Sequence, residues 1–471
     1  MGETGYSSAP QNQGTQGRLF AEPTPGADPA SFQVNNTSSA YYESAYFLAH
    51  KTQVQSVPPP RINPPRLDLA DVIGQDAVAR IQQAHQIVFH AVGDTGAAKV
   101  NHAQTVASAL ANEESVADAM AADARAIGAG APSFFFHLGD VIYSFGEAQY
   151  YHDQFYEAYR AYDRPIFAIP GNHDGMVFGA TSATPQVPSL EAFLRNFCAP
   201  TPGPSPDSGG LVRSVMTQPG VYFTLDAPYV SIIGLYSNVL DGPGVISSQG
   251  GHYPIGDDQL AFLKAELIRL KPDHDAGNRA VLIAVHHPPA SVDSIHGGAT
   301  GLAADIDNCC IAAGLWPDAV LSGHAHLYQR FSRTVNGLNR QIPYVTSGSG
   351  GYAATAAKAN TAAGTTDGPY TLVTPPVVEF GYLTITVAAG AAQKTLTIGF
   401  KSVKGTRDSV TVNLTPVAGN GGGSGGSPVA VIPSGPKGVA IPTEGPPPAG
   451  EGPNPNPVTK PAAGKAAKSD R

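Results

Sequence analysis

Residues 134–143 read Phe-Phe-Phe-His-Leu-Gly-Asp-Val-Ile-Tyr, and this stretch decides the fold. Phe134–Leu138 is an apolar run of strand length that stops at Gly139-Asp140. A strand that is apolar throughout is typical of a parallel sheet covered on both faces. Because glycine permits a tight turn, the carboxylate that follows is held at the end of the strand. The stretch therefore predicts a central strand with Asp140 at its carboxyl end.

The same arrangement occurs before and after this stretch. Ile87–Val92 ends at Gly93-Asp94, and Ile166–Ile169 ends at Gly171-Asn172. Strands that alternate with helices indicate βαβ units and a parallel sheet. Further elements are predicted in both directions: helices at 67–86, 106–127, 149–162 and 259–270, and strands at 221–225, 230–235, 280–285, 319–321, 344–346, 382–387, 395–400 and 409–414.

Two histidine motifs follow later predicted strands. His286-His287-Pro288 comes after the strand at 280–285, and Gly323-His324-Ala325-His326 comes after the strand at 319–321. On an extended segment, His324 and His326 would point to the same side of the chain. Carboxylate and amide oxygens together with imidazoles suit hard or borderline cations. Because polar groups at the carboxyl ends of strands meet at one edge of the sheet, the motifs predict a metal site there.

Each oxygen-bearing motif also has a purely structural interpretation. Gly-Asp is a common strand–helix turn in which Asp caps the helix. Gly171-Asn172-His173-Asp174 also fits a Gly-Asn turn with a capping Asp174. Recurrence after successive strands favours the metal interpretation over these.

In order, the five motifs resemble the pattern of the calcineurin-like metallophosphoesterase superfamily over about residues 87–326. The commonest form of that pattern has Asp-x-His in the first block, whereas here Gly96 stands in place of the histidine. Purple acid phosphatases show the same departure and carry a tyrosine three residues after the second Asp. Tyr143 stands at that position, so the chain resembles the purple acid phosphatase branch.

The resemblance implies a fold and a set of roles. The fold is a four-layer α-β-β-α sandwich of two mixed sheets, in the α/β class. Two adjacent metals are implied: Fe(III) at the Tyr143 site, and Fe, Mn or Zn at the second. The implied ligands are Asp94, Asp140, Tyr143 and His326 for the first metal, and Asp140 again, Asn172, His286 and His324 for the second.

The implied activity is hydrolysis of phosphate esters by a metal-activated hydroxide, as an acid-phosphatase-like phosphomonoesterase. His173 would protonate the leaving oxygen, and Asp174 would either orient His173 or have a structural role. Candidate substrate-binding residues are His287, His296 and Tyr328. Two alternatives stay open: a phosphodiesterase that acts on nucleotides or phospholipid head groups, and a non-catalytic scaffold of the same fold.

Composition divides the chain into four parts. The chain has 53 glycines and 42 prolines, and both residue types are concentrated toward its two ends. We expect a disordered N-terminal segment at 1–40, an arm and helix packed on the catalytic domain at 41–86, the catalytic domain at 87–416, and a disordered Gly/Pro-rich tail at 417–471.

Net charge, hydropathy and cysteine content argue against several classes of protein. The formal net charge of -9 argues against a nucleic-acid-binding protein, which normally shows a basic patch. No apolar run approaches the ~18 residues of a membrane span. The N-terminus has no basic region followed by an apolar run, so a cytoplasmic location is the default expectation. Three cysteines, two of them adjacent, predict no disulfide framework. The expected partner is a small phosphate ester, and nothing specifies an oligomeric state.

Overall fold

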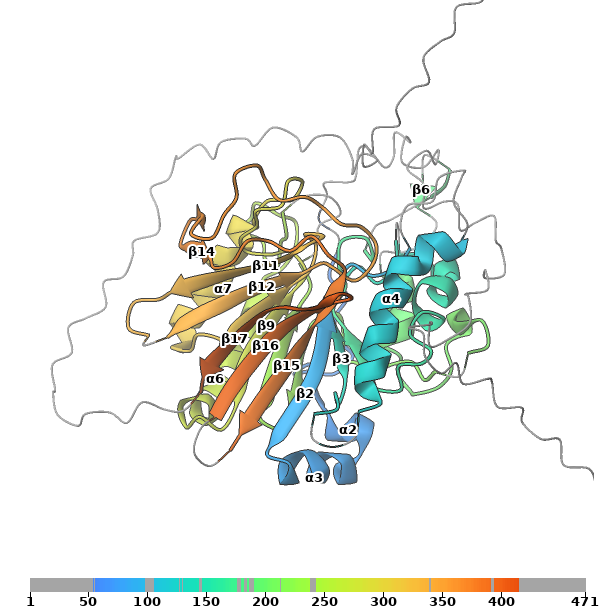
Figure 1. The fold of residues 1–471 in the computed structure, drawn as a ribbon, viewed down its shortest axis with the longest axis horizontal. Coiled ribbons are helices and arrows are strands. Elements are labelled where there is room, and N and C mark those ends of the chain that lie inside the picture. The colour runs from blue at the N-terminus through green and yellow to red at the C-terminus, as the bar shows by residue number, and fades with distance from the viewer. Residues whose placement is uncertain are drawn as a thin grey trace, which may run out of the picture. The chain divides into compact units, whose positions relative to one another are not determined.

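Two mixed β-sheets pack against each other in this computed structural model (Figure 1). The structure describes residues 54, 56–97, 106–126, 128, 130–143, 146–175, 179–181, 184–185, 190–211, 213–237, 243–338, 340–390 and 394–414. The chain divides into two units, Met1–Asn420 and Gly421–Arg471, and every described residue lies in the first. The predicted disordered segments at 1–40 and 417–471 lie outside the described residues.

The larger sheet has nine strands with a parallel centre. Strands β8, β9, β10 and β12 run parallel to one another, and antiparallel or short strands complete the edges. The order is β1 (Arg66–Asp68), β7 (Phe223–Ala227), β8 (Val230–Leu235), β9 (Ala280–Val285), β10 (Ala319–Ser322), β12 (Gln341–Ser347), β11 (Tyr328–Thr334), β14 (Tyr370–Leu372) and β13 (Thr366–Asp367).

The smaller sheet has six strands and is also mixed. Its β2, β3 and β4 are parallel, with His90 opposite Phe135 and Phe135 opposite Ile166. The other strands are antiparallel. The order is β17 (Gly405–Asn413), β16 (Lys394–Ser402), β15 (Gly381–Ala389), β2 (Gln86–Val92), β3 (Phe135–His137) and β4 (Ile166–Ala168).

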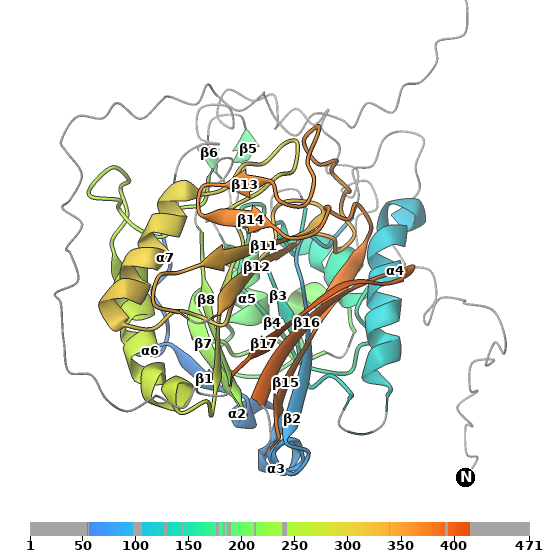
Figure 2. The same ribbon diagram turned by 60° about the vertical axis from the view of Figure 1, so that its left-hand side comes forward.

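Helices cover both outer faces, as Figure 2 shows. Helices α6 (Asp258–Asp275) and α7 (Thr300–Ala313) lie on the larger sheet, and α4 (Val106–Ala124) lies on the smaller one. The prediction of a four-layer sandwich of two mixed sheets is thus confirmed. Shorter elements complete the fold: α2 (Ala70–Ile73), α3 (Gln75–Gln83), α5 (Glu191–Phe197), β5 (Gly179–Thr181), β6 (Thr184–Pro185) and the 3₁₀ turns η2 (Ala148–Tyr150) and η4 (Pro206–Ser208).

The central strands are apolar on both sides because each side meets a different layer. In β8, Val230 and Ile232 belong to the core between the sheets, whereas Ile233 and Leu235 pack in the cluster that includes α6 and α7. Burying each such aliphatic side chain contributes roughly 1.5–3 kcal/mol. Both cores therefore fix the carboxyl ends of the parallel strands in place.

The single helix predicted for 67–86 is wrong. Residues Arg66–Asp68 form β1 and pair in parallel with β7, and two helices, α2 and α3, follow. Gly74 separates these helices with a φ of 82°, a conformation that breaks an α-helix and suits glycine. Strand β1 therefore lies where the predicted arm meets the predicted helix, and it forms an edge of the larger sheet.

The α-helix predicted for 149–162 is also wrong. The segment forms the 3₁₀ turn η2 and the π-helix η3 (His152–Tyr156), followed by turns. Tyr151 and Phe155 are buried here, so tertiary packing outweighs the local preference for a regular helix. Single π-helical turns occur often at functional sites, and this one lies beside the site described below.

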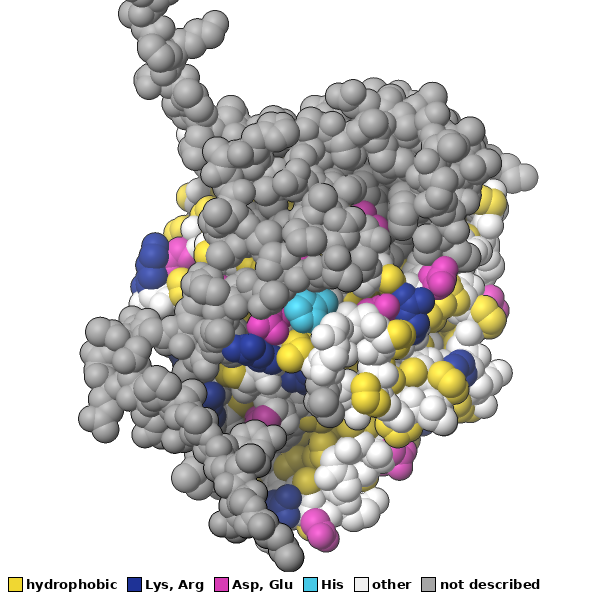
Figure 3. All heavy atoms as spheres, turned by 90° about the vertical axis from the view of Figure 1, so that its right-hand side faces the viewer, with side chains coloured by type: hydrophobic (Ala, Val, Ile, Leu, Met, Phe, Trp, Pro, Cys, Tyr) yellow, Lys and Arg dark blue, Asp and Glu magenta, His cyan; other side chains and the backbone are white. Residues whose placement is uncertain are grey.

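The described surface mixes charges of both signs. On the face shown in Figure 3, basic and acidic side chains lie among one another rather than in separate patches. Ion pairs among the described residues include Arg195 with Asp207 at 2.8 Å and Arg407 with Glu379 at 2.7 Å. Within the described part of the chain, no helix is both long enough and apolar enough to cross a bilayer.

Candidate metal centre

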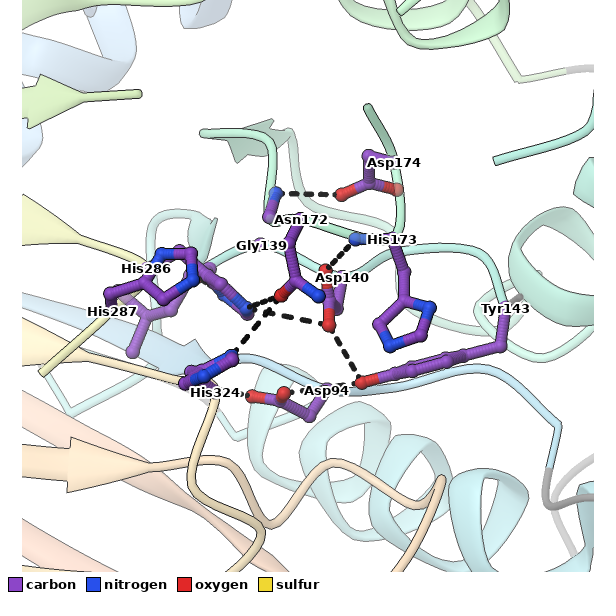
Figure 4. A network of polar contacts seen from close by, with 12 residues as sticks. Asp94, Gly139, Asp140, Tyr143, Asn172, His173, Asp174, His286, His287 and His324 are labelled. Atoms are coloured by element: carbon purple, nitrogen blue, oxygen red, sulfur yellow. Dashed lines mark hydrogen bonds and ion pairs between the residues drawn. The ribbon is translucent and has the colours of Figure 1, made fainter. Parts of the chain in front are cut away.

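Five parallel strands from the two sheets end at one cluster of polar side chains (Figure 4). Strands β2, β3 and β4 of the smaller sheet lead to Asp94, Asp140 and Asn172, and β9 and β10 of the larger sheet lead to His286 and His324. Backbone hydrogen bonds join the loops across the sheets, such as Gly93 N to Ser347 O at 3.0 Å. The predicted convergence of these distant motifs is present.

Asp140 occupies the centre of the cluster. Its Oδ2 accepts a hydrogen bond from the Tyr143 hydroxyl at 2.9 Å and lies 3.4 Å from His286 Nε2. Its Oδ1 accepts the backbone N–H of His173 at 2.9 Å. A side chain on Gly171 would collide with this carboxylate, which explains the glycine before Asn172.

One group of side chains lies on the Asp94 side of Asp140. The Tyr143 hydroxyl lies 3.2 Å from Asp94 Oδ1 and 3.4 Å from His326 Nε2, and His326 Nε2 lies 3.4 Å from Asp94 Oδ1. The second Asp94 oxygen accepts the His324 backbone N–H at 2.8 Å. Three chemically suitable donor atoms therefore face one another within a few ångströms.

A second group lies on the other side of Asp140. Asn172 Oδ1 lies 3.1 Å from both His286 Nε2 and His324 Nδ1. Asp94, Asp140 and His286 each offer a ligand atom, and these atoms all lie within 4.8 Å of one another. All three residues are buried, so the cluster is suited to hold a cation.

Three residues of the cluster also have a strained backbone. Asp94, Asp140 and His324 have positive φ values of 58°, 54° and 67°. A non-glycine residue in this conformation costs on the order of 1–3 kcal/mol and persists where the surrounding structure enforces it. The strained turns aim these three side chains into the cluster, which favours a functional role.

The buried carboxylates of the cluster favour positive charge next to them. Burial opposes the charged form of His286, but the negative charges of Asp140 and Asp94, together with the hydrogen bonds to Asp140 and to the Leu138 carbonyl, outweigh burial and raise the pKa of His286 to about 9. His286 Nδ1 donates to the Leu138 carbonyl at 2.9 Å, which leaves Nε2 facing Asp140 and Asn172. A cation that binds between Asp140 and Asn172 would therefore displace the proton on His286 Nε2.

The environment of Gly96 explains the departure from Asp-x-His. Gly96 has a φ of 78°, and a Cβ there would lie 2.7 Å from Gln154 Oε1 and 3.3 Å from the Tyr143 ring. Tyr143 and Gln154 therefore occupy the space that a side chain at position 96 would need. The presence of Tyr143 and the absence of a histidine at position 96 therefore have the same steric cause.

The His324-x-His326 segment was expected to be extended, and this is wrong. His324 is left-handed, and the Ala325 N–H returns to the Gly323 carbonyl at 2.8 Å. Both rings still face the cluster because the turn replaces the alternation of a strand. The expectation failed since the strand, β10, ends before the motif at Ser322.

His173 and Asp174 point in different directions (Figure 4). The His173 ring lies 4.4 Å from the Tyr143 ring, centre to centre, at the edge of the cluster. The Asp174 carboxylate accepts the backbone N–H groups of Val141, Ile142 and Gly171 at 2.9–3.2 Å. These bonds fasten the loop that carries Asp140 to the loop that carries Asn172, which favours the structural alternative for Asp174.

We expect Asp174→Ala to destabilise the fold by at least about 2 kcal/mol, because it leaves buried N–H groups without an acceptor. Asp174→Asn keeps one acceptor oxygen and should lose less. Denaturant unfolding of both variants measures the difference. Unchanged stability together with a lower rate would instead assign Asp174 to the orientation of His173.

Two of the three substrate-binding candidates reach the cluster. The rings of His287 and His296 lie 4.1 Å and 4.3 Å from the His324 ring. His287 Nδ1 pairs with the Ser237 hydroxyl at 2.7 Å, and His287 Nε2 is buried with no hydrogen-bond partner among the described residues.

The structure does not place Tyr328 at the site. It is fully buried in the core between the sheets, its ring stacks on Phe400 at 4.3 Å, and its hydroxyl donates to Asp408 at 2.7 Å. Tyr328 begins β11 and lies past the turn that carries His326, so its side chain enters the core instead. The expectation that it lines the pocket is corrected accordingly.

Sequence reasoning missed Tyr352, which packs directly on the cluster. Its ring stacks on Tyr143 at 3.4 Å with an interplanar angle of 1°, and it lies 5.2 Å from the His326 ring. The only available signal was the run Gly348-Ser349-Gly350-Gly351 before it, which follows strand β12.

The three cysteines are free and buried, as expected.

The chain belongs to the calcineurin-like phosphoesterase family, whose model matches residues 87–328. No curated protein sequence matches the chain. Among solved structures, it is similar to a purple acid phosphatase from yellow lupin (Lupinus luteus) seeds, with 14% identity, a TM-score of 0.47, and coverage of 70% of this chain and 54% of that one. The chain thus spans about half of the lupin protein's length.

Two further solved structures are similar at comparable levels. One is GAP50, the anchor in the inner membrane complex of Plasmodium, with 13% identity, a TM-score of 0.45, and coverage of 70% of this chain and 89% of that one. The other is a dimetal phosphatase from Danio rerio, with 12% identity, a TM-score of 0.41, and coverage of 70% and 99%.

Proposed function

We propose that this protein hydrolyses small phosphate esters, preferentially monoesters, with the help of two metal ions held by the cluster. Membership of the phosphoesterase family supports the reaction class. The residues that would hold one ion are Asp94, Asp140, Tyr143 and His326, and those that would hold the other are Asp140, Asn172, His286 and His324.

One observation carries the proposal: a single oxygen belongs to both groups. Asp140 Oδ2 lies 2.9 Å from the Tyr143 hydroxyl and 3.4 Å from His286 Nε2. A carboxylate placed between two sets of donors is suited to bridge two cations.

The distances among the donor atoms also fit metal coordination. With metal–ligand bonds of about 2.1 Å, neighbouring ligands are about 3.0 Å apart in an octahedron and about 3.4 Å apart in a tetrahedron. Neighbouring donor atoms in these groups lie 2.9–3.4 Å apart. These separations support the proposal that the residues hold a pair of ions.

When bound, two such ions lower the pKa of water and neutralise charge on the phosphoryl oxygens. The chain's own residues supply the rest. The backbone N–H of His173 is fixed on Asp140 at 2.9 Å, which places its imidazole next to Tyr143. An imidazole there can donate a proton to the departing ester oxygen, the usual role of a general acid near neutral pH.

The experiment is a paired assay on purified protein. The protein is stripped with chelator, reloaded with iron, manganese or zinc, and tested on para-nitrophenyl phosphate and its bis-ester. The proposal expects metal-dependent turnover, faster for the monoester. Faster turnover of the diester would favour the phosphodiesterase alternative. No turnover with any metal would favour a non-catalytic scaffold.

Tyr143 suggests Fe(III) in the first position, with Fe, Mn or Zn in the second, because a phenolate is a hard anionic donor. We expect iron-loaded protein to show a visible phenolate-to-iron absorption band that disappears in Tyr143→Phe. Tyr352→Phe keeps the neighbouring ring and should retain the band, so it is the matched control. A colourless iron-loaded wild type would contradict the tyrosine–iron assignment while leaving hydrolysis open to the assay above.

A further inference from the structure

Three buried glutamines each hold both main-chain polar groups of one distant residue. Gln154 accepts the Tyr143 N–H at 3.0 Å and donates to its carbonyl at 2.9 Å. Gln218 binds Ala168 in the same way, at 2.8 and 2.9 Å. Gln259 binds Tyr236, at 2.9 and 2.8 Å. Each amide thereby satisfies both the N–H and the carbonyl of the residue it binds.

Gln154 differs from the other two because it joins a third group. Its Oε1 also accepts the Ala97 N–H at 3.2 Å. Ala97 follows the Asp94 turn, and Tyr143 follows the Asp140 turn. One fully buried amide therefore ties together the two loops that supply the carboxylates of the cluster.

The local chain is shaped to admit this amide. Gln154 lies in the π-helix η3, whose wider turn departs from regular helical spacing. Gly96 has no side chain, and a Cβ there would lie 2.7 Å from Gln154 Oε1. Both local irregularities therefore accommodate the same contact.

The Tyr143 ring is confined as well as its backbone. Tyr352 covers one face of the ring at 3.4 Å, and the hydroxyl lies 3.2 Å from Asp94 Oδ1 and 2.9 Å from Asp140 Oδ2. With the ring plane fixed in this way, the position of the phenol oxygen follows the position of the Tyr143 backbone.

We propose that Gln154 is a positioning residue that places the Tyr143 phenol oxygen between Asp94 and Asp140. The inference rests on the proposed function, because it assigns Gln154 a role in the metal site. Loss of the amide frees the Tyr143 loop from the Asp94 loop. Residues that orient metal ligands typically change metal affinity by about 10- to 100-fold when they are replaced.

The test compares Gln154→Leu with Gln218→Leu. Both remove a fully buried amide that binds one residue's backbone, so both should lower stability, and Gln154→Leu should lower it more because the Ala97 N–H also loses its acceptor. We expect only Gln154→Leu to weaken Fe(III) binding in a chelator competition by about 10- to 100-fold and to shift the iron–phenolate band. Gln154→Glu keeps the acceptor oxygen for both N–H groups but loses the donor to the Tyr143 carbonyl, so it should restore part of the affinity and also serves if the leucine variant does not fold.

A metal-independent measurement separates this inference from the proposed function. In metal-free protein with isotope-labelled tyrosine, the Tyr143 ring resonance, assigned with Tyr143→Phe, should move in Gln154→Leu and stay in place in Gln218→Leu. If it moves while the wild type binds no metal, the proposed function is wrong and the positioning role stands. If resonance, affinity and band all stay unchanged in Gln154→Leu, or change equally in Gln218→Leu, the positioning role is overturned.

Discussion

Asp140→Ala is expected to abolish binding of both metal ions and to lower phosphatase activity by at least about 1,000-fold. The reason is that Asp140 Oδ2 lies near both donor groups, 2.9 Å from the Tyr143 hydroxyl and 3.4 Å from His286 Nε2. Its removal also leaves the His173 N–H without the acceptor it has at 2.9 Å. Metal content after dialysis and the rate on para-nitrophenyl phosphate measure the effect.

Asp318→Ala is the matched control for this variant. Asp318 is as buried as Asp140, and it accepts the Val281 N–H at 2.8 Å and pairs with Arg340 at 2.9 Å. It precedes β10, at the end of that strand opposite the cluster. Asp318→Ala should therefore lose stability and keep its metal. If Asp140→Ala retains two ions per chain, the bridging role is wrong.

His173→Ala is expected to lower kcat by about 100- to 10,000-fold while both metal ions stay bound. The loss should be largest for alkyl phosphates, whose alkoxide needs a proton to leave. It should be smaller for para-nitrophenyl phosphate, because nitrophenolate leaves readily without one. Rates on both substrates, together with metal content, separate acid catalysis from damage to the site.

His274→Ala is the control for the histidine variant. His274 belongs to helix α6, away from the donor groups, and its Nε2 lies 3.3 Å from Asp318 Oδ1. Both rates should therefore stay near those of the wild type. An equal loss on the two substrates in His173→Ala would show that His173 does not protonate the leaving group.

The strands were the most predictable part of the fold. The bounds predicted for 230–235 and 280–285 match β8 and β9 because these strands are apolar on both faces. Strand β11 was missed because its burial depends on pairing that the local sequence does not show. Its Arg330 and Arg333 are buried through ion pairs with Asp408 and Asp307.

The candidate metal ligands of the cluster could be predicted because they lie in short motifs at the ends of strands. The orientation of Asp174, the burial of Tyr328 and the stacking of Tyr352 depend on residues far away in the chain. Gln154 carried no signal, since nothing in a single glutamine shows that it binds two loops. Chemistry that is local in sequence was therefore visible, and the supporting contacts were not.

The most direct test of the account is anomalous X-ray scattering from crystals of the metal-loaded protein at the iron, manganese and zinc edges. We expect two peaks, one beside Asp94, Tyr143 and His326, the other beside Asn172, His286 and His324, with Asp140 in contact with both. A single peak, or peaks away from Asp140, would contradict a two-metal site built on this carboxylate.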